Sequence, residues 1–105
     1  MMITAKFEYK GEDIVAYEIS GHASSDSPGK DLVCAGVSAV AFGLTNALIG
    51  LGLDEDRVQL DDGYLRVDTT NADEDMNALI YGLIVSLETI EREHDEYLSV
   101  INCNH

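Results

Sequence analysis

Hydrophobic residues follow two different spacings along the chain, and these spacings separate predicted strands from predicted helices. Loose alternation of apolar and polar residues, as around Ile3, Phe7 and Tyr9, is typical of strands. Apolar residues three and four positions apart, as from Met76 to Ile90, are typical of a helix with one buried face. The predicted strands are residues 2–9, 14–19, 57–60, 64–68 and 97–101, and the predicted helices are residues 31–50 and 72–94.

The order of these elements is β-β-α-β-β-α-β, which is two hairpins, each followed by a helix, and a last strand. We therefore expect an α+β fold, a mostly antiparallel sheet with two helices packed on it. Turn residues at 10–13 and the Asp61-Asp62-Gly63 turn connect the strands of the two hairpins. No linker divides the chain, so residues 1–105 are expected to form a single domain.

Residues near the predicted helix starts indicate how each helix is capped. Asp31 is a suitable N-cap for the first helix and would place Cys34 at its third position. Thr69-Thr70-Asn71 would cap the second helix. Residues 20–30, rich in small and polar types, form a predicted loop that is longer than a connection requires.

The first helix has an unusual composition, because no charged residue occurs between Leu32 and Leu53. That length raises the question of a membrane span, but polar residues and four glycines interrupt it, and we expect a buried central helix and no membrane association. Gly36, Gly43 and Gly50 recur every seven residues. Because each glycine costs a helix about 1 kcal/mol relative to alanine, we expect the sheet or the second helix to approach this stripe closely.

The charge balance excludes one class of function. Twenty Asp and Glu against 6 Lys and Arg give a formal net charge of −14. Phosphate binding needs clustered basic side chains, so direct nucleic-acid binding is not expected. The acidic surplus serves either solubility or the attraction of a basic partner.

Cysteine usage and the first residues indicate the compartment. Two cysteines, Cys34 and Cys103, do not make a disulfide framework. A single bridge between them stays open and would leave Cys34 without a reactive thiol. Residues 1–6 lack the long apolar run of a signal peptide, so thiols in a reducing cytoplasm are expected.

Cys34 and His22 are the candidate catalytic pair. A thiol near a helix start is favoured as thiolate by the unpaired N–H groups and the helix dipole. His22 lies twelve residues earlier, in a loop that must return to that helix, and an imidazole within reach could take the thiol proton. The other interpretation is that Cys34 is a small core residue and His22 an ordinary loop histidine.

Three further residues could support this pair. Asp31 could cap the helix, orient the histidine or contact substrate. Ser38 lies one turn after Cys34 on the same helix face, and either lines a pocket or bonds to the Cys34 carbonyl. Gly21 precedes the histidine directly.

Other chemistries find less support in the sequence. Cys103 and His105 with another histidine match no structural zinc pattern, so neither a metal nor a cofactor is expected. A non-enzymatic module that binds a basic protein through its acidic surface stays open. The hypothesis of a redox sensor based on Cys34 has less support, because no resolving cysteine lies nearby in sequence.

Two motifs in this chain resemble those of the bacterial ribosomal-processing cysteine proteases, the Prp family. They are Gly21-His22-Ala23 and the stretch Gly29-Lys30-Asp31-Leu32-Val33-Cys34-Ala35-Gly36-Val37-Ser38, in which Leu32 replaces the isoleucine of the family. Length and element order match over the whole chain.

The resemblance implies a cysteine endopeptidase with Cys34 as nucleophile and His22 as its base. The alternative is a non-enzymatic acidic module that binds a basic ribosomal or assembly protein. It implies cytoplasmic homodimers that remove an N-terminal extension from a basic large-subunit ribosomal protein, the twenty-seventh of that series. It also implies that the loop between histidine and cysteine closes over the peptide, with Gly21 and Gly29 as candidate hinges.

Overall fold

The computed structural model describes residues 2–21 and 28–104. Within these residues five strands form one sheet, accompanied by two long helices and a short 3-10 turn. The strands are β1 (Ile3–Lys10), β2 (Asp13–Ser20), β3 (Val58–Asp61), β4 (Tyr64–Asp68) and β5 (Leu98–Asn104). The helices are α1 (Pro28–Gly50), η1 (Glu55–Arg57) and α2 (Glu74–Glu93).

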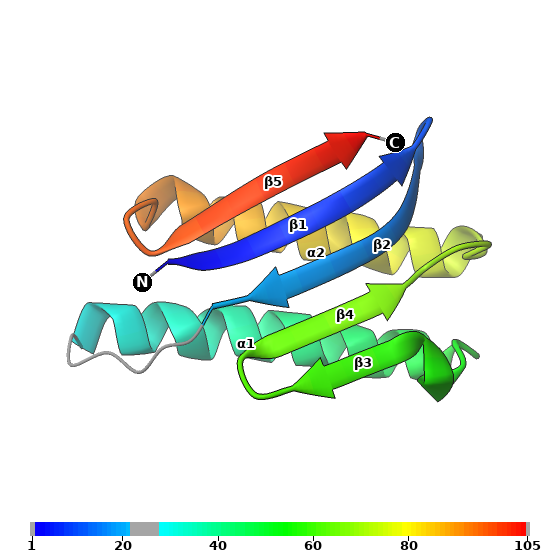
Figure 1. Ribbon diagram of the computed structural model, residues 1–105, viewed down its shortest axis with the longest axis horizontal. Coiled ribbons are helices and arrows are strands. Elements are labelled where there is room, and N and C mark those ends of the chain that lie inside the picture. Colours follow the sequence, from blue (N-terminus) through cyan, green and yellow to red (C-terminus); the bar gives the residue numbers. More distant parts are fainter. Residues whose placement is uncertain (1, 22–27, 105) are drawn as a thin grey trace.

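The strand order in the sheet is β3-β4-β2-β1-β5. Neighbouring strands are antiparallel except β1 and β5, the first and last strands of the chain, which run parallel from Ile3 opposite Leu98. Both helices lie on one face of the sheet, side by side (Figure 1). The predicted α+β class, element order and mostly antiparallel sheet are confirmed.

The core lies between the sheet and the helix layer. The strand residues that point toward the helices are almost fully buried, and the tilted rings of Phe7 and Tyr17 pack there with centroids 6.0 Å apart. The Tyr17 hydroxyl lies 2.7 Å from the Thr45 hydroxyl of α1, which satisfies both buried polar groups. Burial raises the pKa of Tyr17 to about 12, so this phenol stays neutral at physiological pH.

The opposite face of the sheet carries a charged cluster rather than a second layer. Arg66 lies between Glu8 and Glu18, and its guanidinium contacts both carboxylates. Tyr64 donates a hydrogen bond to Glu18, and Lys6 lies 3.7 Å from the same carboxylate. In this cluster of five side chains, the two basic residues offset the charge of the two carboxylates on a half-buried surface.

Helix α1 begins three residues earlier than predicted. It starts at Pro28, so Asp31 is an exposed residue of the first turn and not the N-cap. Proline is favoured at the first helical position, because its fixed φ suits the helix and the missing N–H would be unpaired there anyway. Gly29 lies inside this helix and does not flank a loop. The cap of α2 also differs from the prediction: Asp73 accepts from the Met76 N–H at 2.9 Å.

The glycine stripe of α1 is mostly open. A Cβ at Gly36 would lie 3.7 Å from Ile90 of α2, which is ordinary contact, whereas a Cβ at Gly43 or Gly50 would meet nothing within 4 Å. The expected close approach is therefore wrong for Gly43 and Gly50. The helix is also not buried all round: 28 % of Asp31–Gly50 is buried, and by length and composition alone this helix could cross a membrane.

Candidate active site

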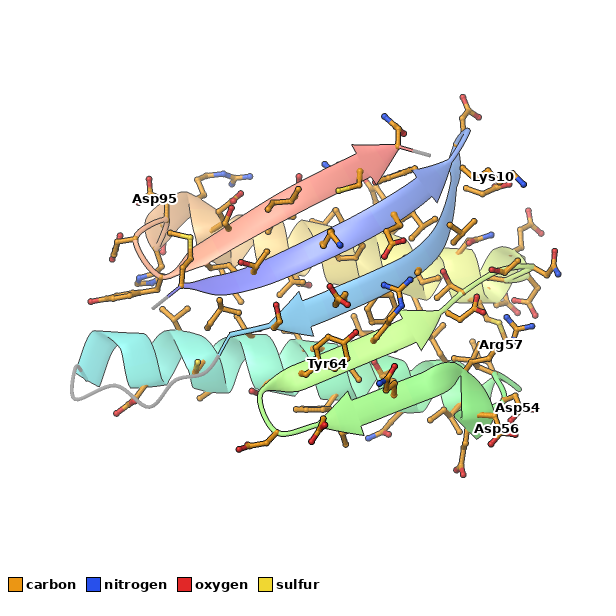
Figure 2. The ribbon with its side chains drawn as sticks, in the orientation of Figure 1. Lys10, Asp54, Asp56, Arg57, Tyr64 and Asp95 are labelled. Atoms are coloured by element: carbon orange, nitrogen blue, oxygen red, sulfur yellow. The ribbon has the colours of Figure 1, made fainter. Side chains whose placement is uncertain are left out.

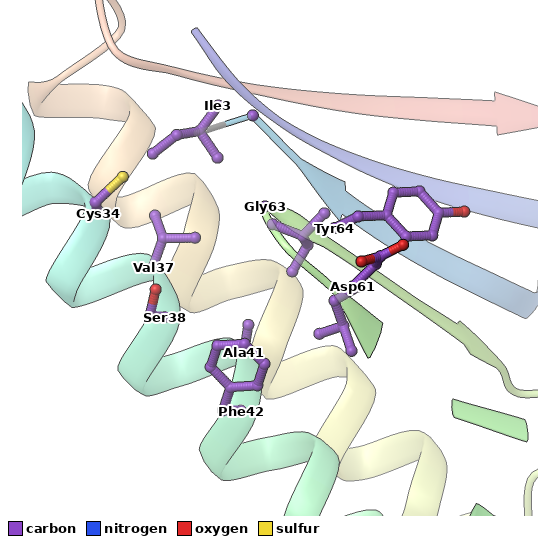
Figure 3. Close-up of a pocket in the computed structure, with 12 residues that line it drawn as sticks. Ile3, Cys34, Val37, Ser38, Ala41, Phe42, Asp61, Gly63 and Tyr64 are labelled. Atoms are coloured by element: carbon purple, nitrogen blue, oxygen red, sulfur yellow. The ribbon is translucent and has the colours of Figure 1, made fainter. Parts of the chain in front are cut away.

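A cavity of about 240 Å³ lies between α1 and the turn that joins β3 to β4. One wall is a side of α1, and the other comes from the ends of β1, β2 and the β3–β4 hairpin (Figure 3). Twelve described residues line it: Ile3, Ile19, Gly21, Cys34, Val37, Ser38, Ala41, Phe42, Asp61, Gly63, Tyr64 and Leu65. Small-molecule sites measure roughly 300–1,000 Å³, so this cavity suits one or two side chains of a longer ligand.

Cys34 lies at one end of the cavity. It is half-buried on α1, and its sulfur points from the helix toward the strand side (Figure 3). Neither Cys34 nor Cys103 forms a disulfide, which answers the question of a bridge between them. The thiol therefore has access to the cavity and to whatever the cavity binds.

The position of Cys34 in the helix differs from the prediction in a way that changes its chemistry. Because α1 begins at Pro28, Cys34 is in the second turn and not at the third helical position. The unpaired N–H groups of a helix belong to its first turn, and the dipole effect fades beyond that turn. The helix start alone therefore activates the thiol less than the sequence suggested, and a base beside it becomes more important.

Gly21 joins β2 to the segment that contains His22. Its φ of +109° is one that side chains rarely adopt, and a Cβ there would lie 2.5 Å from the Met2 carbonyl oxygen. Its N–H donates to the Gly63 carbonyl at 3.2 Å, which ties the end of β2 to the β3–β4 turn. Gly21 lines the same cavity as Cys34, so the end of β2 and helix α1 border one site.

The candidate residues differ in where they lie. Gly21, Cys34 and Ser38 come together around the cavity, as expected for a shared site. Asp31 does not line it and is exposed to solvent. His22 lies outside the described residues.

The hairpin side of the cavity contributes two polar residues. Asp61 is the charged member among the described lining residues. The hydrogen bond that Tyr64 donates to Glu18 raises the pKa of its phenol, so this hydroxyl is neutral and already engaged. Tyr64 therefore borders the cavity at the hairpin while its ring turns toward the charged cluster on the opposite face (Figure 3), and it is a poor candidate for proton transfer.

Sequence reasoning missed most of the cavity wall. Phe42 lies on the same side of α1 as Cys34 and Ser38, and the spacing of four from Ser38 could have indicated it. Asp61, Gly63 and Tyr64 gave no such signal, because their place beside α1 follows from the strand order of the sheet.

Comparison with known proteins decides what kind of site this is. The model of the family described as "Cysteine protease Prp" matches residues 2–99. The chain belongs to the Prp family of cysteine proteases. It is 43 % identical to the ribosomal processing cysteine protease Prp of Bacillus subtilis, over 83 % of this chain and 84 % of that one. It is 40 % identical to the Staphylococcus aureus protein of the same name, over 90 % and 89 %.

Solved structures of the Prp fold agree with this membership. Prp from S. aureus with a substrate peptide superimposes with a TM-score of 0.85 at 31 % identity, over 96 % of this chain and 99 % of that one. The same enzyme with a covalently linked product peptide gives a TM-score of 0.82 at 32 % identity over the same shares. A Streptococcus mutans protein gives 0.86 at 28 % identity, over 99 % and 96 %. The protein is thus a cysteine protease, and the non-enzymatic binding module is excluded.

Proposed function

We propose that this protein cleaves a peptide bond in the N-terminal extension of a large-subunit ribosomal protein, the twenty-seventh of that series, with Cys34 as nucleophile and His22 as base. The observation that carries the proposal is that Cys34 and Gly21, the residue next to His22, line one cavity. The relatives are named for ribosomal processing, and the S. aureus enzyme has been solved with a substrate peptide. The family resemblance of the sequence supplies the particular ribosomal substrate.

In the proposed reaction His22 takes the proton of the Cys34 thiol, and the sulfur attacks the scissile carbonyl carbon. The carbon–nitrogen bond breaks as His22 returns the proton to the leaving amine, which leaves an acyl thioester on Cys34. Water then attacks the thioester, His22 takes its proton, and the thiol is regenerated. A covalently linked product peptide in the S. aureus relative supports a covalent intermediate of this kind.

The oxyanion of each tetrahedral intermediate needs hydrogen-bond donors near Cys34. The first turn of α1 supplies unpaired backbone N–H groups one turn before the cysteine. Helical side chains tilt toward the N-terminus, so the Cys34 sulfur is directed back toward that turn. Residues at the start of α1, including Asp31, are therefore proposed to hold the oxyanion through their backbone and not through side chains.

The cavity wall favours an apolar side chain of the substrate next to the cleaved bond. Val37, Ala41 and Leu65 are buried and apolar, and Phe42 adds an aromatic ring at the rim. Burying an apolar side chain there contributes roughly 1.5–3 kcal/mol to binding. Ser38 is the polar residue on α1 that could contact the peptide backbone.

The proposed working state is a homodimer in the cytoplasm, without metal or cofactor, acting as a single domain of residues 1–105. The net charge of −14 suits a basic protein substrate, because opposite charges raise the rate of encounter. Nucleic acid is not a proposed direct partner, because so acidic a chain repels phosphates.

The test is incubation of the purified protein with the ribosomal protein that carries its extension, reading the new N-terminus by mass spectrometry. Cys34→Ala, Cys34→Ser and His22→Ala are each expected to abolish cleavage while circular dichroism and the unfolding midpoint stay unchanged. Cys103→Ser, which removes the other thiol from β5, is the matched control and should cleave normally. Normal turnover by a Cys34 or His22 variant would disprove the pair.

A thiol titration checks the activation of Cys34 separately from substrate choice. Alkylation of the folded wild type is expected to modify Cys34 at pH values below about 8.5, the pKa of an ordinary thiol, and much faster than Cys103. His22→Ala should slow this reaction, because the histidine carries more of the activation once Cys34 lies in the second helical turn. Equal rates in wild type and His22→Ala would show that the histidine does not act on the thiol.

A further inference from the structure

The helix layer has an outer face without charge. No charged residue occurs in Leu32–Leu53 of α1 or in Met76–Leu87 of α2, although the chain contains 20 acidic and 6 basic residues. The exposed residues in the central part of this face are here called the helix face: Leu32, Ala35, Ala39, Phe42 and Gly43 of α1, and Ala78, Tyr81 and Val85 of α2. Both helices contribute, and they lie side by side (Figure 1).

The helix face exposes more apolar surface than solubility favours. Leu32 is 71 % exposed and Tyr81 70 %, and Phe42 and Val85 are each 41 % exposed. Contiguous apolar surface of this kind marks an interaction site in soluble proteins. Gly43 lies on the same face and lowers helix propensity, yet among the described residues a Cβ there would meet nothing within 4 Å.

The charges around the helix face indicate which kind of partner can bind there. A helix that binds a membrane surface carries an excess of Lys and Arg beside its apolar face, whereas α1 and α2 contain only two basic residues, Lys30 and Arg92, against six acidic ones. A basic substrate protein would be drawn to the acidic surfaces and not to this one. Two copies of the chain, each at −14, repel one another least where both are uncharged, and the helix face is such a surface.

We propose that the helix face binds the helix face of a second copy, forming a two-fold symmetric dimer with the layers sheet, helices, helices, sheet. This rests on the homodimeric state proposed above and assigns its interface. Small side chains at Ala35, Ala39 and Gly43, one turn apart on α1, allow the helices of the two copies to approach closely. The molecule measures 39 × 24 × 19 Å, and its broad face can supply the roughly 800 Å² that each partner of a standard interface buries.

This assignment leaves the active site accessible. Phe42 lies both at the rim of the cavity and at the edge of the helix face, whereas Cys34 faces the strand side. The second copy therefore lies beside the cavity without covering the thiol. It encloses the outer side of the Phe42 ring and limits the motion of that part of the rim.

Sedimentation equilibrium of the full chain tests the proposal, with wild type expected at twice the 11.4 kDa chain mass. Ala39→Glu and Tyr81→Glu each place two carboxylates in the interface, so the dissociation constant of the dimer should rise by roughly 100-fold or more. Ile101→Glu is the matched control, because Ile101 is 41 % exposed on β5 and lies opposite Lys6 on the sheet face away from the helices, so its variant should stay dimeric. Ala39→Ser keeps the position small and neutral and should also stay dimeric.

The outcomes separate the interface from the dimer itself. A wild type that sediments as a monomer overturns both the homodimer and its interface, while leaving the protease mechanism intact. A dimer that survives Ala39→Glu and Tyr81→Glu, with circular dichroism confirming that both variants fold, overturns the helix face alone. Binding of a monomeric wild type to phosphatidylcholine vesicles would assign the helix face to a membrane and overturn the proposal as well.

Discussion

Gly21 shows at the scale of one residue how the fold constrains the site. Its backbone conformation places the end of β2 against Met2 and Ile3, and the hydrogen bond to Gly63 ties it to the wall of the cavity. The residue before the proposed base is therefore held by two segments that are far from it in the sequence, the start of β1 and the β3–β4 turn. Glycine is required here for two reasons, the positive φ and the space that a side chain would need.

Gly52 allows the effect of the positive φ to be measured without the effect of crowding. Its φ of +112° matches the +109° of Gly21, but a Cβ there would meet nothing within 4 Å. Gly52→Ala is expected to lower the free energy of unfolding by roughly 1–3 kcal/mol from backbone strain alone. Gly21→Ala should lose a further 1–3 kcal/mol or so, because the Cβ would overlap backbone atoms of β1. Urea denaturation measures both variants, and equal losses would show that the contact with Met2 relaxes without cost.

At the scale of the elements, the sequence predicted what depends on neighbours in the chain. Alternation and helical spacing identified every strand and both long helices, because such patterns reflect one buried face. The start of α1 was misplaced because Asp31 was taken as a cap although Pro28 and its fixed φ mark the start better. The open sides of Gly43 and Gly50 could not be foreseen, since a stripe of small residues indicates close packing but not which surface supplies it.

The candidate site also contains residues that the sequence could predict and residues that it could not. Cys34 and Ser38 share a helix face, so their common cavity follows from spacing alone. The opposite wall, with Asp61 and Tyr64, exists because β4 lies beside β2 in the sheet, and pairing between distant strands leaves no local signature.

The two aspartates near the helix starts allow a test of the corrected caps. Asp73 accepts the Met76 N–H, so Asp73→Ala should lower the free energy of unfolding by about 1 kcal/mol. Asp31→Ala should cost less than half as much, because this residue acts only through the helix dipole and its removal also relieves repulsion in an acidic chain. Chemical denaturation at low salt compares the two, and a larger loss for Asp31→Ala would restore its role as the cap.

At the scale of the whole molecule, charged and uncharged residues lie on different surfaces. Asp54 and Asp56 project from one end beside Arg57, Asp95 lies at the other end, and Lys10 marks the tip of the first hairpin (Figure 2). The helix layer between these ends is uncharged in its centre. The acidic surplus thus surrounds the molecule at its periphery, where it can act on a partner over several ångströms.

Salt should reveal this long-range attraction. Raising NaCl from about 50 to 500 mM shortens the screening length to well under 10 Å, and kcat/KM for the intact basic ribosomal protein should fall several-fold. A short peptide without net charge that spans the cleavage site serves as the control and should change little. A parallel decline for protein and peptide would trace the effect to the chemistry or the stability of the enzyme, and the surface charge would then serve solubility alone.

The parallel pairing of β1 with β5 has a consequence for how this protein folds. Strand β1 lies between β2 and β5, and its register with β5 runs from Ile3 opposite Leu98 to Tyr9 opposite Asn104. One edge of β1 thus stays open until a strand far along the chain pairs with it, and closing so long a loop makes folding slow. Until that pairing forms, the open edge of β1 can pair with another chain, so closure of the sheet is the folding step most exposed to aggregation.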